Sequence, residues 1–175
     1  MKRKIVLFIL IWAFFILQTT VFRFLQIAST SPNLLLILTV SFGFMEGKKH
    51  GLFTGFFCGI LIDLFYGSVI GYYALIYMFI GYFCGFLCDI YFDRDIRVPL
   101  ILVTVCDFLY GLVIYLTRFL LRGRSDFGGY LTSVILPEIV YTVLMTLVLY
   151  KLLYLINRKL SENEKRVTKN PWLKS

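Results

Sequence analysis

The chain is 175 residues long and is 59% hydrophobic and 18% aromatic, with only 16% charged residues. Its mean hydropathy of +0.83 excludes a water-soluble domain and predicts an integral membrane protein with room for one compact domain and no soluble catalytic domain. A positive bias on the cytoplasmic side and attraction to anionic membrane lipids account for the net charge of +8, so nucleic acid is not an expected partner.

Hydrophobic runs predict an all-α bundle of six transmembrane helices, because each crossing needs roughly 20 apolar residues. We place these helices near residues 5–22, 33–46, 51–66, 69–92, 98–121 and 130–156. The second and third are short, so they must stand upright, lie in thinned bilayer or extend into flanking residues. We therefore expect a membrane domain over 1–157 and a basic, mobile cytoplasmic tail over 158–175.

Turn and helix-start signals separate the predicted helices. They are Ser31-Pro32-Asn33, Gly47 to Gly51, Asp93-Arg94-Asp95 and Gly123 to Gly129. A single long helix over 33–66 would bury Lys48, Lys49 and His50 in lipid, so we reject a four-helix arrangement. Only a weak cleavage site, "QIAST" at 26–30, follows the first apolar run, and we expect the first helix to be retained.

Basic residues predict the orientation. With the N-terminus in the cytoplasm, 14 of the 18 Lys and Arg residues lie on the inner side and four on the outer side. Both termini are therefore predicted to be cytoplasmic, as an even number of helices requires. Tyr66, Tyr72 and Tyr73 fall at the outer surface, where we expect them to belong to the interfacial aromatic belt and to bind nothing specific.

Glycines recur at every fourth position from Gly43 to Gly59, and Asp63 takes the next place in the series. Small residues at this spacing let two helix backbones approach closely in a membrane, so the series predicts a packing face. A similar patch follows on the fourth helix. Helix-packing or partner-binding roles are predicted for Gly51, Gly55, Gly59, Asp63, Gly67, Gly71, Gly81 and Gly85. One sequence leaves open whether these faces meet each other or the helix of a partner.

Charged residues inside a membrane should be paired or should face a polar cavity. The candidates are Asp107, Arg118 and Glu138, and we expect Arg118 to pair with Glu138 or Asp63 in the outer half of the bundle. Three interpretations stay open: structural pairing, a site for a solute or ion, and a polar surface that recognises another protein's helix.

Signals of catalysis and of metal or cofactor binding are not found in the sequence. His50 falls in a polar turn with no second imidazole, and the cysteines lie in apolar helices, where thiols act as small fillers. No GxSxG, HExxH, Walker or GxGxxG motif occurs. We expect no enzyme and no cofactor; a membrane enzyme acting through Asp107 or Glu138 is kept as a third hypothesis.

The first 90 residues carry a recognisable pattern. A basic start and an apolar helix lead to "FILQTTVF", then "SPNLLLILTVSFGFMEGKKHGLFTGFFCGILIDLFYGSVIGYYAL" follows, with Gly-Tyr behind it. This pattern resembles the bacterial rod shape-determining protein MreD family. The matching positions are Gln18, Pro32, Gly55, Gly59, Asp63, Gly67, Gly71 and Gly81, whereas Asn33 stands where the family has an acidic residue.

The resemblance implies a non-enzymatic scaffold of the cell-elongation machinery in the bacterial inner membrane. Its implied direct partner is MreC, with MreB, RodA and a class B transpeptidase of peptidoglycan synthesis in the same complex. It also implies a fold similar to the S components of energy-coupling-factor transporters, and a vitamin-binding S component is the alternative function. The outer half offers few polar groups beyond Arg118, Glu138 and Asp63, so we expect a poor cavity for a polar vitamin.

Overall fold

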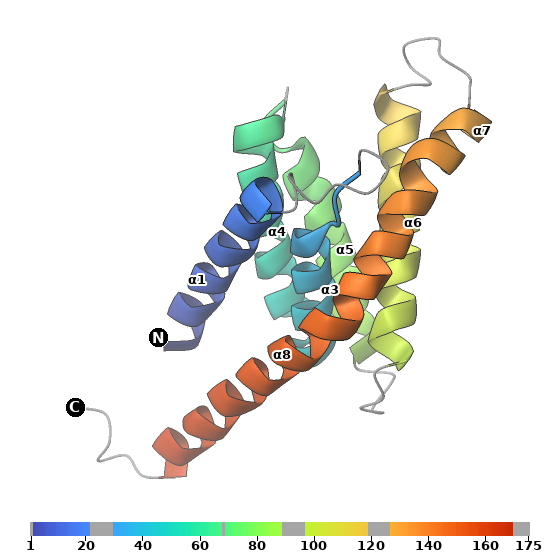
Figure 1. The fold of residues 1–175 in the computed structure, drawn as a ribbon. Coiled ribbons are helices and arrows are strands. Elements are labelled where there is room, and N and C mark those ends of the chain that lie inside the picture. The colour runs from blue at the N-terminus through green and yellow to red at the C-terminus, as the bar shows by residue number, and fades with distance from the viewer. Residues whose placement is uncertain (1, 22–29, 68, 89–96, 119–126, 170–175) are drawn as a thin grey trace.

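The computed structural model describes residues 2–21, 30–67, 69–88, 97–118 and 127–169. Within these ranges the chain is all-helical, as predicted (Figure 1). The helical elements are α1 (Lys2–Ile16) with the π-turn η1 (Leu17–Val21), α3 (Leu34–Glu46), α4 (Lys48–Tyr66), α5 (Tyr72–Cys88), α6 (Arg97–Arg118), α7 (Phe127–Tyr130), the π-turn η3 (Leu131–Ile135) and α8 (Leu136–Lys169). Since η1 continues α1, and α7, η3 and α8 follow one another without a break, these residues form six continuous helical segments.

Helix α3 forms the centre of the bundle. Every side chain from Leu34 to Phe44 is buried, and the helix contacts α1, α4, α5, α6 and α8. Because neighbouring helices cover every face of α3, the helix needs no contact with lipid or water. The 13-residue length of α3 is therefore compatible with an interior position.

The outside of the bundle is also apolar. Large hydrophobic side chains such as Phe53, Phe83 and Val148 are more than half exposed, at 62%, 60% and 68%. Among the described residues, Arg97–Thr117 and Phe127–Leu160 are long and apolar enough to cross a membrane, and Ile5–Val21, Leu34–Glu46 and Tyr72–Cys88 are apolar but shorter. A protein that has both an apolar core and an apolar outer surface is suited to being surrounded by lipid.

The joint between α3 and α4 is shorter than the sequence indicated. Gly47 alone separates the two helices, and α4 begins at Lys48, although we expected a turn as far as Gly51. Gly47 has a φ of +86°, which lets a single residue reverse the chain. Its N–H donates to the carbonyl of Gly43, and its carbonyl accepts from the N–H of Gly51.

The last helix is longer than predicted. Helix α8 continues to Lys169, so the first part of the predicted tail over 158–175 is helical. No proline or glycine interrupts the chain between Glu138 and Lys169, and the first helix breaker after that point is Pro171. In Figure 1 the first residues of α1 and the last residues of α8 lie at the same, lower end of the view.

Candidate functional site: a glycine-packed helix pair and a tyrosine-lined cavity

Helices α4 and α5 are packed backbone to backbone. The residues Gly51, Gly55 and Gly59, which we call the glycine face, point at Gly81, Tyr77 and Ala74 of α5 respectively. A Cβ added at Gly55 would lie well inside 3.0 Å of the carbonyl oxygen of Tyr77, a separation that real Cβ atoms essentially never show. Gly81 is equally restricted by the carbonyl of Gly51. The glycine face is thus occupied by a helix of the same chain.

The close contact continues at both ends of the pair. A Cβ at Gly85 would collide with the backbone of Lys48, and a Cβ at Gly43 would lie 2.8 Å from the carbonyl oxygen of Gly81. Helices α3, α4 and α5 therefore form a tight three-helix unit, as their shared contacts also indicate. Close approach of this kind allows many weak dispersion and CH···O contacts to accumulate.

Asp63 holds the connection between α4 and α5. Its Oδ2 accepts hydrogen bonds from the N–H groups of Gly71 (3.0 Å) and Ala74 (2.9 Å), and its Oδ1 accepts one from Tyr73 (2.9 Å). The side chain is 1% exposed. Asp63 therefore caps the N-terminus of α5 from a different helix, where a carboxylate satisfies unpaired backbone donors and complements the helix dipole.

Two glycines shape this connection. Gly67 ends α4, where its N–H donates to the carbonyl groups of Ile62 and Asp63. Gly71 has a φ of +101°, a left-handed conformation that favours glycine, directly before α5 begins at Tyr72. Helix α5 therefore starts three residues later than the predicted start at residue 69. The residues before it form the turn that places the first backbone N–H groups of α5 next to Asp63.

The start of α3 is held by the side chain of its own N-cap residue and by side chains from two other segments. The N–H of Leu36 donates to Oδ1 of Asn33, and the N–H of Leu35 donates to Oε1 of Gln18 at 3.2 Å. The N–H of Asn33 in turn donates to the hydroxyl of Thr142 on α8. Gln18 from η1 thus caps α3, and Pro32 lies buried directly before the cap.

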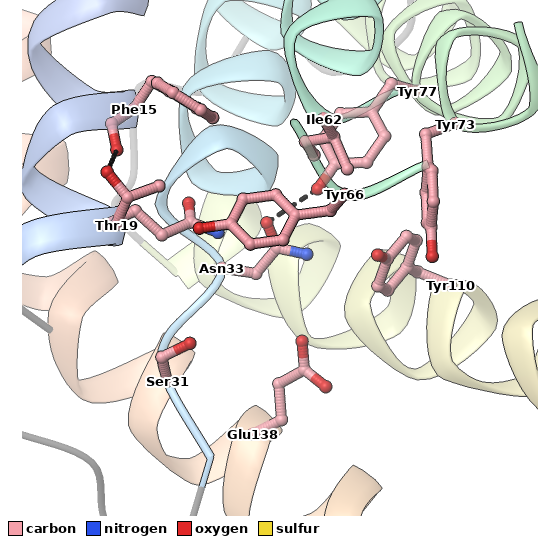
Figure 2. A pocket seen from close by; sticks show the side chains of 11 residues that line it. Phe15, Thr19, Ser31, Asn33, Ile62, Tyr66, Tyr73, Tyr77, Tyr110 and Glu138 are labelled. Atoms are coloured by element: carbon pink, nitrogen blue, oxygen red, sulfur yellow. Dashed lines mark hydrogen bonds between the residues drawn. The ribbon is translucent and has the colours of Figure 1, made fainter. Parts of the chain in front are cut away.

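A cavity of about 350 Å³ lies where these capped helix ends meet. Figure 2 shows the side chains around it, which come from α1, η1, α4, α5, α6, α8 and the segment before α3. The lining residues are Phe15, Gln18, Thr19, Ser31, Asn33, Ile62, Tyr66, Tyr73, Tyr77, Tyr110 and Glu138. Its wall holds more polar groups than we expected from Arg118, Glu138 and Asp63 alone.

The inner wall of the cavity is held by a buried hydrogen bond and by contacts between aromatic rings. The hydroxyl of Tyr77 donates to Oδ1 of Asn33 at 2.7 Å, and both side chains are almost completely buried, at 0% and 4% exposure. The rings of Tyr73 and Tyr77 lie 6.3 Å and 5.7 Å from the ring of Tyr110. Aromatic pairs at these distances stabilise one another and fix the position of each ring.

The predicted intramembrane charges lie in different surroundings. Glu138 lines the cavity. Asp107 is 2% exposed, and neither carboxyl oxygen has a hydrogen-bond partner among the described residues, although Thr142 lies beside it. The side chain of Arg118 lies outside the described part of the chain, so its pairing stays a prediction. Asp63 accepts hydrogen bonds from three backbone N–H groups.

Four tyrosines of the cavity were not identified as site residues from the sequence. Tyr66 and Tyr73 were assigned to the interfacial belt, but both line the cavity, together with Tyr77 and Tyr110. A signal was present for two of them, because Tyr73 and Tyr77 precede Gly81 and Gly85 in the same four-residue interval. That spacing puts all four on one face of α5, the face that meets α4 and the cavity.

Comparison with known proteins gives one match. The family model described as rod shape-determining protein MreD matches residues 1–160, which includes all the helices apart from the last turns of α8. No match is found among curated proteins or among solved structures. The expected likeness to the S components of energy-coupling-factor transporters therefore stays a prediction.

Proposed function

This chain belongs to the family of rod shape-determining protein MreD, and from that membership we propose that it is a non-enzymatic membrane scaffold of the bacterial cell-elongation machinery. The match over residues 1–160 is the observation that carries the proposal, because it includes all the helical segments, with α8 as far as residue 160, and not only a shared motif. In this role the chain organises peptidoglycan synthesis by holding other membrane proteins in place.

The proposed partners are those of the machinery. MreC binds the chain directly, and MreB, RodA and a class B transpeptidase belong to the same complex. The chain crosses the inner membrane several times with both termini in the cytoplasm. Support comes from the apolar outer surface and from the ends of α1 and α8, which lie at one end of the bundle.

The packing of the bundle restricts where a partner can bind. The glycine face is filled by α5, so partner helices have to use other surfaces of the protein. The rigid α3–α4–α5 unit supplies a fixed platform for such contacts, since its helices cannot move apart without breaking backbone contacts. The glycines then support partner binding indirectly, by keeping the platform in one conformation.

Depletion and co-purification test the scaffold function together. Depleting the protein in its native bacterium should make rod-shaped cells round and reduce growth of the lateral wall, and affinity purification from membranes should recover MreC. Gly55→Leu, which forces α4 and α5 apart, should fail to restore rod shape or to bind MreC. Gly128→Ala, at a position where the added Cβ would meet no other described segment of the chain within 4 Å, is the control and should restore both. Normal rods after full depletion would contradict the proposal.

The cavity favours one alternative function, the binding of a vitamin as a transporter S component. Its volume of about 350 Å³ lies near the lower limit of the range of roughly 300–1,000 Å³ for ligand pockets. A transporter subunit should create a nutritional requirement when it is depleted, and a scaffold should not. Growth of depleted cells with and without added vitamins therefore separates the two functions.

A further inference from the structure

The wall of the cavity combines aromatic rings with a single acidic group. Among its lining residues are four tyrosines and Glu138, and none of them is Lys, Arg or His. Figure 2 shows the Glu138 carboxylate on the opposite side of the cavity from Tyr66 and Tyr77, with Tyr73 and Tyr110 to one side. Aromatic ring faces and carboxylates both attract positive charge, so the wall suits a cation.

The charge of Glu138 is not balanced by the described part of the protein. No hydrogen bond or ion pair joins its carboxylate to another side chain that the structure describes, and the side chain of Arg118, which the sequence pairs with Glu138 or Asp63, lies outside that part of the chain. The carboxyl group of Asp107 lies close enough to interact with it electrostatically, and this group also has no hydrogen-bond partner among the described residues. A carboxylate in this position is costly unless a cation or water accompanies it.

Asn33 adds a donor on the same wall. Its Oδ1 is engaged by Tyr77 and Leu36, whereas its Nδ2 makes no hydrogen bond to a described residue. Figure 2 shows this amide nitrogen directed into the cavity, and the residue is only 4% exposed. The cavity thus presents a fixed donor near a carboxylate, an arrangement that recognises an oxygen next to a positive charge.

The identity of the wall groups favours an organic cation over a metal ion. Ca²⁺ and Mg²⁺ require about six or more oxygen ligands, often several of them carboxylates, and here one carboxylate is accompanied by rings. Ammonium groups, in contrast, bind well between a carboxylate and aromatic faces. The volume of about 350 Å³ admits a small headgroup or amine.

We propose that this cavity binds an ammonium group that carries a neighbouring oxygen, as in ethanolamine, supplied either by a lipid headgroup or by a free small amine. Glu138 pairs with the ammonium, the tyrosine rings surround it, and Nδ2 of Asn33 donates to the oxygen. This site is additional to the scaffold function and does not depend on it.

Thermal unfolding of the purified full-length protein tests the proposal. Nanodiscs of phosphatidylglycerol alone are compared with nanodiscs that also contain phosphatidylethanolamine, and free ethanolamine is titrated into the first set. Ethylene glycol, which has a hydroxyl in place of the amine, is the uncharged control ligand. We expect the unfolding midpoint to rise with ethanolamine or with phosphatidylethanolamine and not with ethylene glycol.

Two variants locate the effect. Glu138→Gln keeps the shape of the side chain and removes its charge, so it should weaken the response to the amine by about tenfold or more. Glu46→Gln removes a carboxylate at the other end of α3 and should leave the response unchanged. If Glu138→Gln does not fold, Tyr110→Phe and Tyr110→Leu are measured in its place. Tyr110→Phe keeps the aromatic ring and should keep the response to the amine. Tyr110→Leu removes the ring and should lose the response.

The outcomes are distinct. If the unfolding midpoint rises with phosphatidylethanolamine and not with free ethanolamine, the ligand is a lipid headgroup. If free ethanolamine raises the midpoint to saturation, the ligand is a soluble amine. The proposal is overturned if neither compound stabilises the wild-type protein, if ethylene glycol acts equally well, or if Glu138→Gln responds as the wild type does.

Discussion

At the scale of single residues, Asp63 has the most specific structural role. The series of residues four positions apart has a glycine at Gly59 and a carboxylate at the next place, Asp63. A carboxylate stands at this place because the chain has to turn and start another helix there. Its two oxygens accept from three backbone N–H groups at 2.9–3.0 Å. A glycine at the same position would fit the close packing but would leave those donors without partners.

Asp63→Asn should destabilise the protein by about 2 kcal/mol, since an amide offers one acceptor oxygen and no charge to the donors. Asp107→Asn is the matched control: it changes a carboxyl group that is also buried but has no hydrogen bond within the described residues, so stability should stay equal or increase. Thermal unfolding in detergent, with wild type alongside, measures both changes. Equal losses from the two substitutions would contradict the capping role of Asp63.

At the scale of helices, the main feature is that α4 and α5 contact each other through their backbones. The pairing depends on position, because each small residue of α4 meets a particular group of α5. The same four-residue interval on both helices made close packing predictable. Which helix would fill the glycine face could not be read from the sequence, because small-residue motifs in two helices of one chain are also compatible with a partner's helix.

Gly55→Ala should lower the free energy of unfolding by about 2–3 kcal/mol, since its methyl group would meet the backbone of Tyr77 and main chain cannot move aside as a side chain can. Gly128→Ala adds the same methyl group in open space and should be neutral or stabilise by up to about 1 kcal/mol through its higher helix propensity. The comparison uses thermal unfolding and the amount of each variant in membranes. A stable Gly55→Ala protein would show that α4 and α5 are further apart than described.

At the scale of the whole molecule, a short buried helix is surrounded by the others. Helix α3 needs no lipid contact, so its length does not have to match the bilayer. The exposed surface of the surrounding helices is apolar instead. The cavity lies at one end of this arrangement, at the start of α3 and α5 and the end of α4.

The orientation in the membrane can be tested with alkaline phosphatase fusions, because this enzyme needs disulfides that form only outside the cytoplasm. A fusion after Gly128 should be active, since five helical segments precede that position in a chain that starts in the cytoplasm. A fusion after residue 175 should be inactive. Immunoblotting has to show equal amounts of the two proteins, and the opposite pattern would reverse the proposed orientation.

The helical class and the positions of most helices could be read from the sequence, because apolar runs, turn residues and four-residue intervals are local properties that need no partner. The family was recognisable from the residue pattern of the first 90 residues, and the family match over residues 1–160 confirms it. The packed bundle was needed to show that Asp63 caps α5, that Gln18 caps α3, and that one cavity is lined by Glu138 together with Tyr66, Tyr73, Tyr77 and Tyr110. These contacts join residues that lie far apart along the chain. Hydrophobic periodicity places a residue on one face of its own helix, but which helix meets that face depends on how the whole bundle packs.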